Sequence, residues 1–242
     1  MILSLATFFM IICCASAQII EKNDSLFKYR IKLVESFMEH FNSGKNIVSL
    51  FDAQMLGAGS KAAEDFSNAV STTGVKLNYA DTSWFAVAPC HGKFKGKSVD
   101  FMLILNVEKY GKDLFKWVIA KAQGDFFKLS PPSTDQTIIT PLAHETNFME
   151  LARINSTSVL NVSQKRYKLD ETSVFFAFYN SGLLDIEYVS DLQFIFLQVP
   201  GYVFTVKEFD RESKNSGWLI TSFSKINEKG KMYFLRDIYH EK

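Results

Sequence analysis

Cysteine is scarce in this chain, and its scarcity limits what can hold the fold together. Two of the three cysteines, Cys13 and Cys14, fall in an uncharged N-terminal stretch, and only Cys90 lies farther along. If that stretch is removed, a single thiol remains and no disulfide can form within the mature chain. A small secreted domain stapled by disulfides is therefore excluded, and the fold must depend on its hydrophobic core.

An excess of charge of either sign is also missing. Lysine and arginine number 27, aspartate and glutamate 26, and the formal net charge is +1. This balance gives no reason to expect nucleic acid or an acidic surface as a partner. With only four histidines, a metal site has few ligands to draw on, and we expect neither a metal nor a cofactor.

What the chain does contain is apolar and aromatic. Apolar residues make up 47% and charged residues 22%, as in a globular protein rather than a disordered one. The 23 phenylalanines and 9 tyrosines are unusual. They predict a core rich in aromatic rings, and the alternative is a ligand cavity lined by them.

The N-terminus has the pattern of a secretory signal peptide over residues 1–17. No charged residue occurs in residues 1–20, Leu3 to Ile12 form an apolar stretch of suitable length, and Ala15-Ser16-Ala17 is a small-residue cleavage site. We therefore predict an exported protein of the periplasm or cell surface, with no transmembrane segment after cleavage. The alternatives are an uncleaved membrane anchor and a lipid on Cys13 or Cys14.

Hydrophobic periodicity predicts helices that alternate with groups of strands. In the first helix, the apolar stripe includes Val34, Met38 and Phe41. The predicted helices are Asp24 to Gly44, Ser60 to Ser71, Pro141 to Ile154, Asp170 to Gly182 and Lys231 to Tyr239. The predicted strands are Ser83 to His91, Ser98 to Glu108, Phe115 to Gln123, Ile186 to Gln198, Tyr202 to Asp210 and Trp218 to Ile226.

These elements indicate an α+β fold in which helices pack on antiparallel sheet. Short connections such as Gly92 to Lys97, predicted as a hairpin loop, favour antiparallel neighbours. A proline-containing connector from Ser130 to Pro141 suggests two halves, residues 18–130 and 131–242, although one continuous domain is the alternative. The architecture is then either cone-like or two similar halves, each with helices followed by three strands.

Parts of the chain resemble known families. Phe37-Met38-Glu39-His40-Phe41-Asn42, the segment from His144 to Met149 and the segment from Gln198 to Tyr202 are similar to an exported family of unknown function from Bacteroidetes. The long first helix and the strands that begin with tryptophan also resemble the cone-shaped fold of nuclear transport factor 2 and ketosteroid isomerase. That fold hosts binding modules and enzymes, and it implies no site residue here because no catalytic Asp/Tyr pattern matches.

Cys90 and His144 are the two candidate catalytic residues. Cys90 precedes His91, but neighbours in a strand point to opposite faces, so a thiol–imidazole pair would need a distant histidine such as His40 or His144. His144-Glu145 begins like a zinc-protease motif, but Phe148 stands where the second histidine belongs. We interpret Cys90 as a buried hydrophobic residue and His144 as part of a helix's first turns.

Two further motifs have simpler interpretations. Gly57 to Ala62 fits a relaxed dinucleotide-binding pattern, but no parallel βαβ unit follows, and we interpret it as a flexible loop before a helix. Lys93, Lys95 and Lys97 form a basic hairpin tip that could contact phosphate or anionic lipid headgroups, or could be a solvated turn.

The sequence thus predicts an exported, non-catalytic envelope protein that binds a small molecule or another envelope protein. Two alternatives stay open. One is a hydrolase-type enzyme that uses Cys90 with a distant histidine, and the other is a purely structural or assembly component.

Overall fold

The computed structural model describes residues 34–112, 114–129, 149, 151–154, 162–164, 166–167, 169–212 and 214–239, without the side chains of residues 55–60. The predicted signal peptide, His144 and most of the helix predicted from Pro141 lie outside these residues. Residues 34–43 are helical. The other elements are η1 (Ile47–Leu50), α2 (Ala53–Thr73), β1 (Trp84–Phe94), β2 (Lys97–Lys109), β3 (Phe115–Gln123), η2 (Asp125–Phe127), α3 (Glu171–Asn180), β4 (Leu184–Val189), β5 (Gln193–Phe196), β6 (Tyr202–Phe209), β7 (Gly217–Lys225) and α4 (Glu228–Tyr239).

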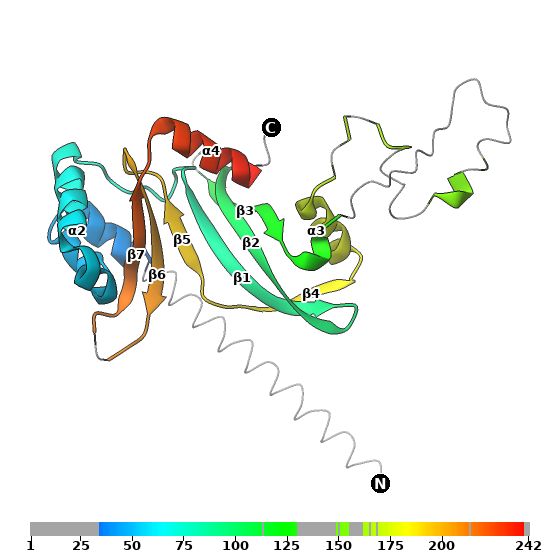
Figure 1. The fold of residues 1–242 in the computed structure, drawn as a ribbon, viewed down its shortest axis with the longest axis horizontal. Coiled ribbons are helices and arrows are strands. Elements are labelled where there is room, and N and C mark those ends of the chain that lie inside the picture. The colour runs from blue at the N-terminus through cyan, green and yellow to red at the C-terminus, as the bar shows by residue number, and fades with distance from the viewer. Residues whose placement is uncertain are drawn as a thin grey trace, which may run out of the picture. The chain divides into compact units, whose positions relative to one another are not determined.

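The fold is α+β, with helices packed on a seven-stranded antiparallel sheet, as the sequence predicted (Figure 1). Hydrogen bonds connect the strands in the order β3-β2-β1-β5-β6-β7, and β4 pairs with β1 beside this path. β5, β6 and β7 form an antiparallel meander in which Phe196 lies opposite Phe204, and Phe204 opposite Phe223.

Two compact units divide the chain, and each unit takes its described residues from separate stretches of the sequence. The first comprises Met1–Ala86, Val107–Lys116 and Asp191–Leu235, and the second Val87–Asn106, Trp117–Ser190 and Arg236–Lys242. The predicted boundary between residues 130 and 131 lies outside the described residues and stays a prediction.

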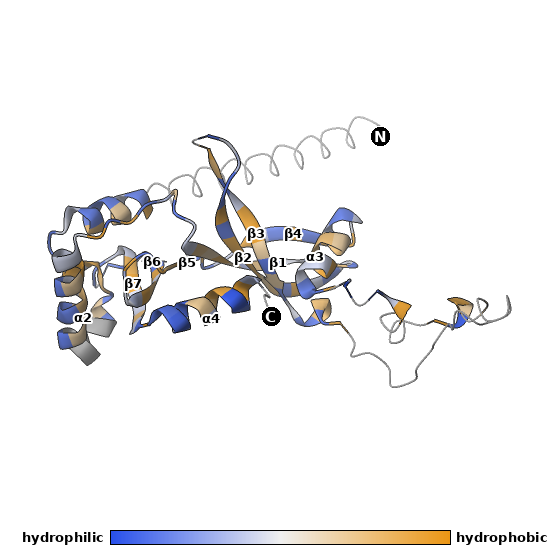
Figure 2. Ribbon diagram, turned by 90° about the horizontal axis from the view of Figure 1, so that it is seen from above, coloured by the Kyte–Doolittle hydropathy of each residue, from blue (hydrophilic) through white to orange (hydrophobic). Residues whose placement is uncertain are grey.

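Helix ends follow the capping rules that located them in the sequence. Asp170 caps α3 by accepting a hydrogen bond from the Ser173 N–H at 2.7 Å, and Gly182 follows the helix with a φ of 70°. α4 begins three residues before the predicted Lys231, and its hydrophilic and hydrophobic positions alternate in Figure 2. The predicted stripe of the first helix is confirmed where it is described, since Val34, Met38 and Phe41 are buried.

The hairpin between β1 and β2 is tighter than predicted. Gly92, Lys93 and Phe94 belong to β1, and Lys97 already belongs to β2, so the turn consists of Lys95 and Gly96. Both residues have positive φ, 51° and 78°, as the commonest two-residue hairpin turn requires. The prediction of a six-residue loop was wrong because a Lys-Gly turn needs only two residues to reverse the chain.

The strand predicted from Ile186 to Gln198 is in fact two strands. β4 ends at Val189 and β5 begins at Gln193. Between them Asp191 adopts a φ of 42°, a left-handed conformation that interrupts an extended chain. The break falls at the polar pair Ser190 and Asp191, and it separates β4 from β5, both of which neighbour β1 in the sheet.

The glycine-rich motif is part of a helix, not a loop. α2 starts at Ala53, seven residues before the predicted start, and it includes the whole of Gly57 to Ala62. The interpretation as a flexible loop was therefore wrong. The helix extends through the two glycines because Asp52 caps it and its later residues, including Phe66 and Val70, are buried in the core.

The core of the first unit is a cluster of aromatic rings around Phe66. Its fully buried ring contacts five others, at centroid distances from 5.1 to 6.3 Å, namely Phe41, Phe51, Tyr202, Phe204 and Phe223. Four of these five contacts are edge-to-face, the arrangement that ring quadrupoles favour. The phenylalanines of this unit therefore form the packed core that the composition predicted.

The second unit has a separate aromatic core around Phe127. Its ring is fully buried and contacts those of Phe101, Phe126, Phe175 and Phe178. A Cβ on Gly124 would lie 3.1 Å from the Phe127 ring, so glycine there lets the chain pass close to it. Thr172 completes the packing, because its hydroxyl accepts a hydrogen bond from the Ala122 N–H at 3.1 Å and so ties α3 to β3.

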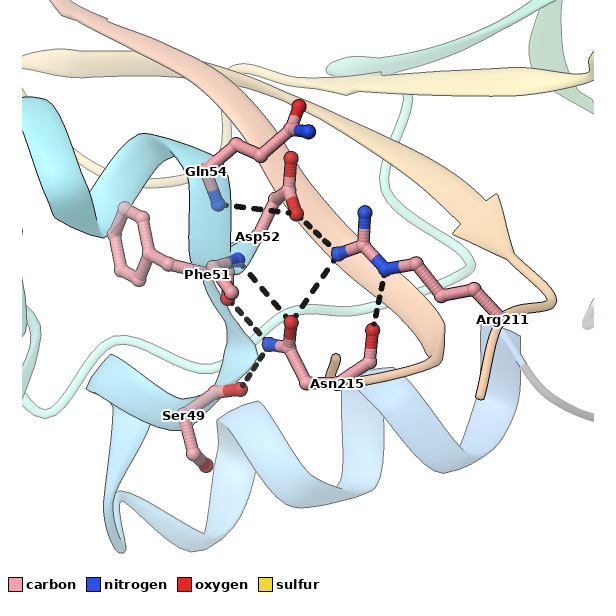
Figure 3. A network of polar contacts seen from close by, with 7 residues as sticks. Ser49, Phe51, Asp52, Gln54, Arg211 and Asn215 are labelled. Carbon is pink, nitrogen blue, oxygen red and sulfur yellow. Dashed lines mark hydrogen bonds and ion pairs between the residues drawn. The ribbon is translucent and has the colours of Figure 1, made fainter. Parts of the chain in front are cut away.

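A partly buried polar network holds the start of α2 to the loop between β6 and β7 (Figure 3). The Asp52 carboxylate accepts hydrogen bonds from the Arg211 guanidinium and from the Gln54 N–H. The Arg211 Nε donates to the carbonyl of Asn215 at 2.9 Å, and the guanidinium lies 4.3 Å from the centre of the Phe209 ring. Arg211 thus joins its own loop, between β6 and β7, to the helix cap Asp52, which lies about 160 residues earlier in the chain.

The side chain of Asn215 completes this network. Its Nδ2 donates to the Phe51 carbonyl at 2.6 Å, and its Oδ1 accepts from the Ala53 N–H at 3.1 Å. One side chain therefore satisfies a donor and an acceptor at the helix start, where backbone groups have no partner within the helix. Burial by itself raises the pKa of Asp52, but the hydrogen bonds from Arg211 and Gln54 outweigh it and hold that pKa below its ordinary value.

Replacing Asp52 with alanine should lower the free energy of unfolding by about 3 kcal/mol, because it leaves the Arg211 charge without its partner and removes the helix cap. Urea denaturation would measure the change. Asp65→Ala, on an exposed position of the same helix, is the control and should change it by less than about 0.5 kcal/mol. Equal effects of the two variants would contradict the role given to Asp52.

The lowered pKa of Asp52 also predicts a pH dependence. Because the folded-state pKa lies below the unfolded one, the carboxylate adds stability at every pH above about 4, and this stability is lost as the pH falls through the folded-state pKa. The loss of unfolding free energy between pH 6 and pH 3 should be smaller in Asp52→Asn than in the natural chain. If the unfolding free energy of Asp52→Asn and of the natural chain fell in parallel with pH, Asp52 would not be the cause of the loss.

Candidate functional site

The candidate site begins with a histidine–aspartate pair on the β1–β2 hairpin. The Nδ1 of His91 lies 2.7 Å from the Oδ1 of Asp100. His91 is four residues before Lys95, and Asp100 is four residues after Gly96, so the two-residue turn places them opposite each other on neighbouring strands. A one-residue change in this turn would separate them.

β4 brings two more side chains to His91, and a glycine makes this possible. A Cβ on Gly92 would lie 2.1 Å from the Asp185 carbonyl oxygen, so only glycine lets β4 approach β1 here. The register shifts between His91 and Gly92, and Tyr188 then lies opposite His91. The Tyr188 ring stacks on the imidazole with centroids 5.0 Å apart, and the Glu187 Oε2 lies 3.9 Å from the His91 Nε2.

Glu187 also pairs with Lys93, one position beyond Gly92 in β1. The Lys93 Nζ lies 2.5 Å from the Glu187 Oε1. This hydrogen bond lowers the pKa of Glu187 and raises that of Lys93, so both groups are charged at neutral pH. The carboxylate is thus held between an ammonium and an imidazole.

We call His91, Lys93, Asp100, Glu187 and Tyr188 the His91 cluster. It is open to solvent, because the Asp100 side chain is 87% exposed and Tyr188 is 53% exposed. It offers carboxylate oxygens as acceptors, an ammonium and a phenol as donors, and one accessible aromatic ring. Throughout the described part of the chain, no group of three or more His, Cys, Asp or Glu residues could hold a metal ion.

Cys90 has the environment of a structural thiol. It is 3% exposed, and its Sγ donates a hydrogen bond to the Ala88 carbonyl at 3.3 Å. Burial raises its pKa to about 11, so the thiol is protonated at neutral pH, whereas an activated nucleophile needs a lowered pKa. His91, its neighbour, belongs to the solvent-open cluster. Of the distant histidines considered as its partner, His40 is exposed, and His144 lies outside the described residues.

The sequence pointed to His91 only as the neighbour of Cys90 and missed its true partners. Asp100 could have been found if Lys95-Gly96 had been recognised as the turn, because equal spacing on both sides then pairs the two residues. Glu187 and Tyr188 could not have been found this way, because nearly 90 residues separate them from Asp100.

Comparison with known proteins does not assign the cluster. No family model, no curated protein and no solved structure matches this chain. Among the helices that the structure describes, none combines the length and the apolar character needed to cross a bilayer.

The environment of Cys90 predicts a slow reaction with iodoacetamide. In the folded chain at pH 8, we expect labelling of Cys90 to be at least about 100-fold slower than in 8 M urea, because the thiol is buried and its pKa is raised. Peptide mass spectrometry would measure the label at Cys90 separately from Cys13 and Cys14. Labelling at similar rates in both states would mean that the thiol is accessible and activated.

Proposed function

We propose that this chain is an exported, non-catalytic binding protein, and that the His91 cluster holds a hydroxyl-rich ligand such as a glycan. The observation that carries the proposal is the half-exposed ring of Tyr188, surrounded by side chains that donate and accept hydrogen bonds. The signal-peptide pattern of residues 1–17 supports export.

The chemistry of the cluster suits a ligand with an apolar face and a polar edge. An aromatic ring offers apolar surface to the C–H face of a sugar, while the polar groups around it bind hydroxyls. Asp100 and Glu187 accept hydrogen bonds from hydroxyl donors, and Lys93 donates to hydroxyl oxygens. A few placed polar groups beside an apolar surface are the usual basis of ligand orientation and specificity.

The charges of the cluster argue against other ligand classes. Two carboxylates, Asp100 and Glu187, face one ammonium, Lys93, so a phosphate or another anionic ligand meets net repulsion. A wholly apolar ligand would cover these charged groups without replacing their contacts with water. A neutral ligand rich in hydroxyls avoids both costs.

A second function, acid–base catalysis, has one observation in its favour. The 2.7 Å contact between His91 and Asp100 has the geometry of a general base held by a carboxylate. However, the other ring nitrogen of His91 lies 3.9 Å from the Glu187 carboxylate, where a substrate would have to approach. Turnover of a glycan by the natural chain would favour this second function over simple binding. A purely structural or assembly role stays the third possibility.

Screening against neutral glycans should identify a ligand whose affinity depends on Tyr188. Tyr188→Ala should weaken binding about 10-fold or more, because it removes the ring against which the ligand packs. Isothermal titration calorimetry would measure the dissociation constants. Tyr79→Ala is the matched control, because Tyr79 is 70% exposed and lies in the other unit.

Two results would contradict the proposal. One is the absence of binding across neutral mono- and oligosaccharides at millimolar concentration. The other is an equal loss of affinity in the two tyrosine variants, which would place the ligand elsewhere. Asp100→Asn gives a second check, since it keeps an acceptor oxygen but loses the charge, and it should weaken binding less than Tyr188→Ala does.

A further inference from the structure

A second surface with a chemistry of its own lies at the β1–β2 turn. Lys95 and Lys97 are exposed on either side of Gly96, and the Lys95 ammonium lies 5.2 Å from the centre of the Phe94 ring. The sequence from Lys93 to Lys97 contains three lysines and no acidic residue. This turn is therefore a concentrated site of positive charge in a chain that is nearly neutral overall.

The structure adds apolar groups that the sequence did not place here. The Lys95 N–H donates to the Leu183 carbonyl at 2.8 Å and so joins the β1–β2 turn to the turn between α3 and β4. Leu183 is 38% exposed, Tyr179 is 51% exposed and Phe176, one helical turn earlier, is 50% exposed. We call Lys95, Lys97, Phe176, Tyr179 and Leu183 the lysine–aromatic end.

The nearby carboxylates leave the charge of this end intact. Glu187 binds Lys93 at 2.5 Å, and Asp185 lies opposite Lys93 in the strand pairing. Within the described residues, no carboxylate forms an ion pair with Lys95 or Lys97. The positive charge at the lysine–aromatic end thus comes from these two lysines, and the carboxylates belong with Lys93.

We propose that the lysine–aromatic end contacts the surface of an anionic lipid bilayer. Lysines near such a surface are attracted by the negative headgroups. Tyrosine suits the bilayer interface because its ring is apolar and its hydroxyl stays in water, and leucine and phenylalanine bury apolar surface among the acyl chains. Lysine stems extend along apolar surface while the ammonium stays at the headgroups. The lysines lie at the β1–β2 turn, and the apolar groups lie on the last turns of α3 and at Leu183, whose carbonyl accepts the hydrogen bond from Lys95.

Vesicle sedimentation with the full chain tests this proposal. Vesicles of phosphatidylcholine alone would be compared with vesicles that contain 30% phosphatidylglycerol. Residues 1–20 have no charged side chain and are the same in every variant, so differences among the variants report the contact made by the lysines. We expect tighter binding to the anionic vesicles, and we expect Lys95→Gln with Lys97→Gln to reduce it about 10-fold or more. Raising the salt concentration should have a similar effect because it screens the exposed charges.

Lys109→Gln with Lys112→Gln is the matched control, because it removes the same charge from the end of β2 and the turn that follows it. This pair should leave binding within about 2-fold of the natural chain. Leu183→Ser provides a second variant at an exposed position, and it should weaken binding to anionic vesicles without abolishing the effect of salt. Circular dichroism melting would verify that each variant is folded.

Three outcomes would overturn the proposal. Equal binding to neutral and anionic vesicles would show that the lysines do not contribute to binding. Equal losses in the two double variants would reduce the effect to net charge alone. Retention on heparin without binding to anionic vesicles would identify a dissolved polyanion, rather than a bilayer, as the partner.

Discussion

Packing of aromatic rings against one another is the interaction on which each unit depends. A chain whose described residues contain only Cys90 gains no stability from a disulfide within them, so it must bury enough apolar surface to offset the entropy of folding. Phe66 and Phe127 lie at the centres of two such clusters, one in each unit. Ring pairs add about 0.5–1.5 kcal/mol each beyond the area they bury, and their preferred angles also restrict how the elements can pack. The unusual phenylalanine content therefore serves the core first.

Polar contacts then determine where the elements begin and how they are joined. Asp52 with Arg211 and Asn215 fixes the start of α2 against a distant loop, and the same contacts satisfy backbone groups that the helix leaves without partners. In the second unit, the turn at Lys95-Gly96 has a similar role. It sets the register of β1 and β2, and through that register it places Asp100 beside His91. Local geometry of a few residues thus decides what the surface of the second unit presents.

The two proposed surfaces share the β1–β2 hairpin but differ in chemistry. The His91 cluster is a balanced set of donors and acceptors around Tyr188, suited to a neutral, hydroxyl-rich ligand. The lysine–aromatic end is cationic and apolar, suited to an anionic bilayer surface. Gly92 lies between His91 and Lys93, and its missing Cβ lets β4 supply Glu187 and Tyr188 to the first surface. An exported protein with both surfaces would meet soluble or surface glycans while held close to a membrane.

Much of this protein could be predicted from the sequence alone, because hydrophobic periodicity and capping residues act locally. They located the helix that contains Val34 and Phe41, the helix capped by Asp170, and the strands from Phe115 to Gln123 and from Tyr202 to Phe209. The errors arose where one backbone conformation overrides a pattern, as at Asp191, or where a distant anchor extends an element, as Arg211 does for α2. Composition predicted the core of aromatic rings, and the order of the periodic segments predicted the α+β fold. Only the tertiary structure could bring His91, Asp100 and Tyr188 together. Their contacts depend on the Lys95-Gly96 turn between β1 and β2, and on the register shift at Gly92 that lets β4 approach β1.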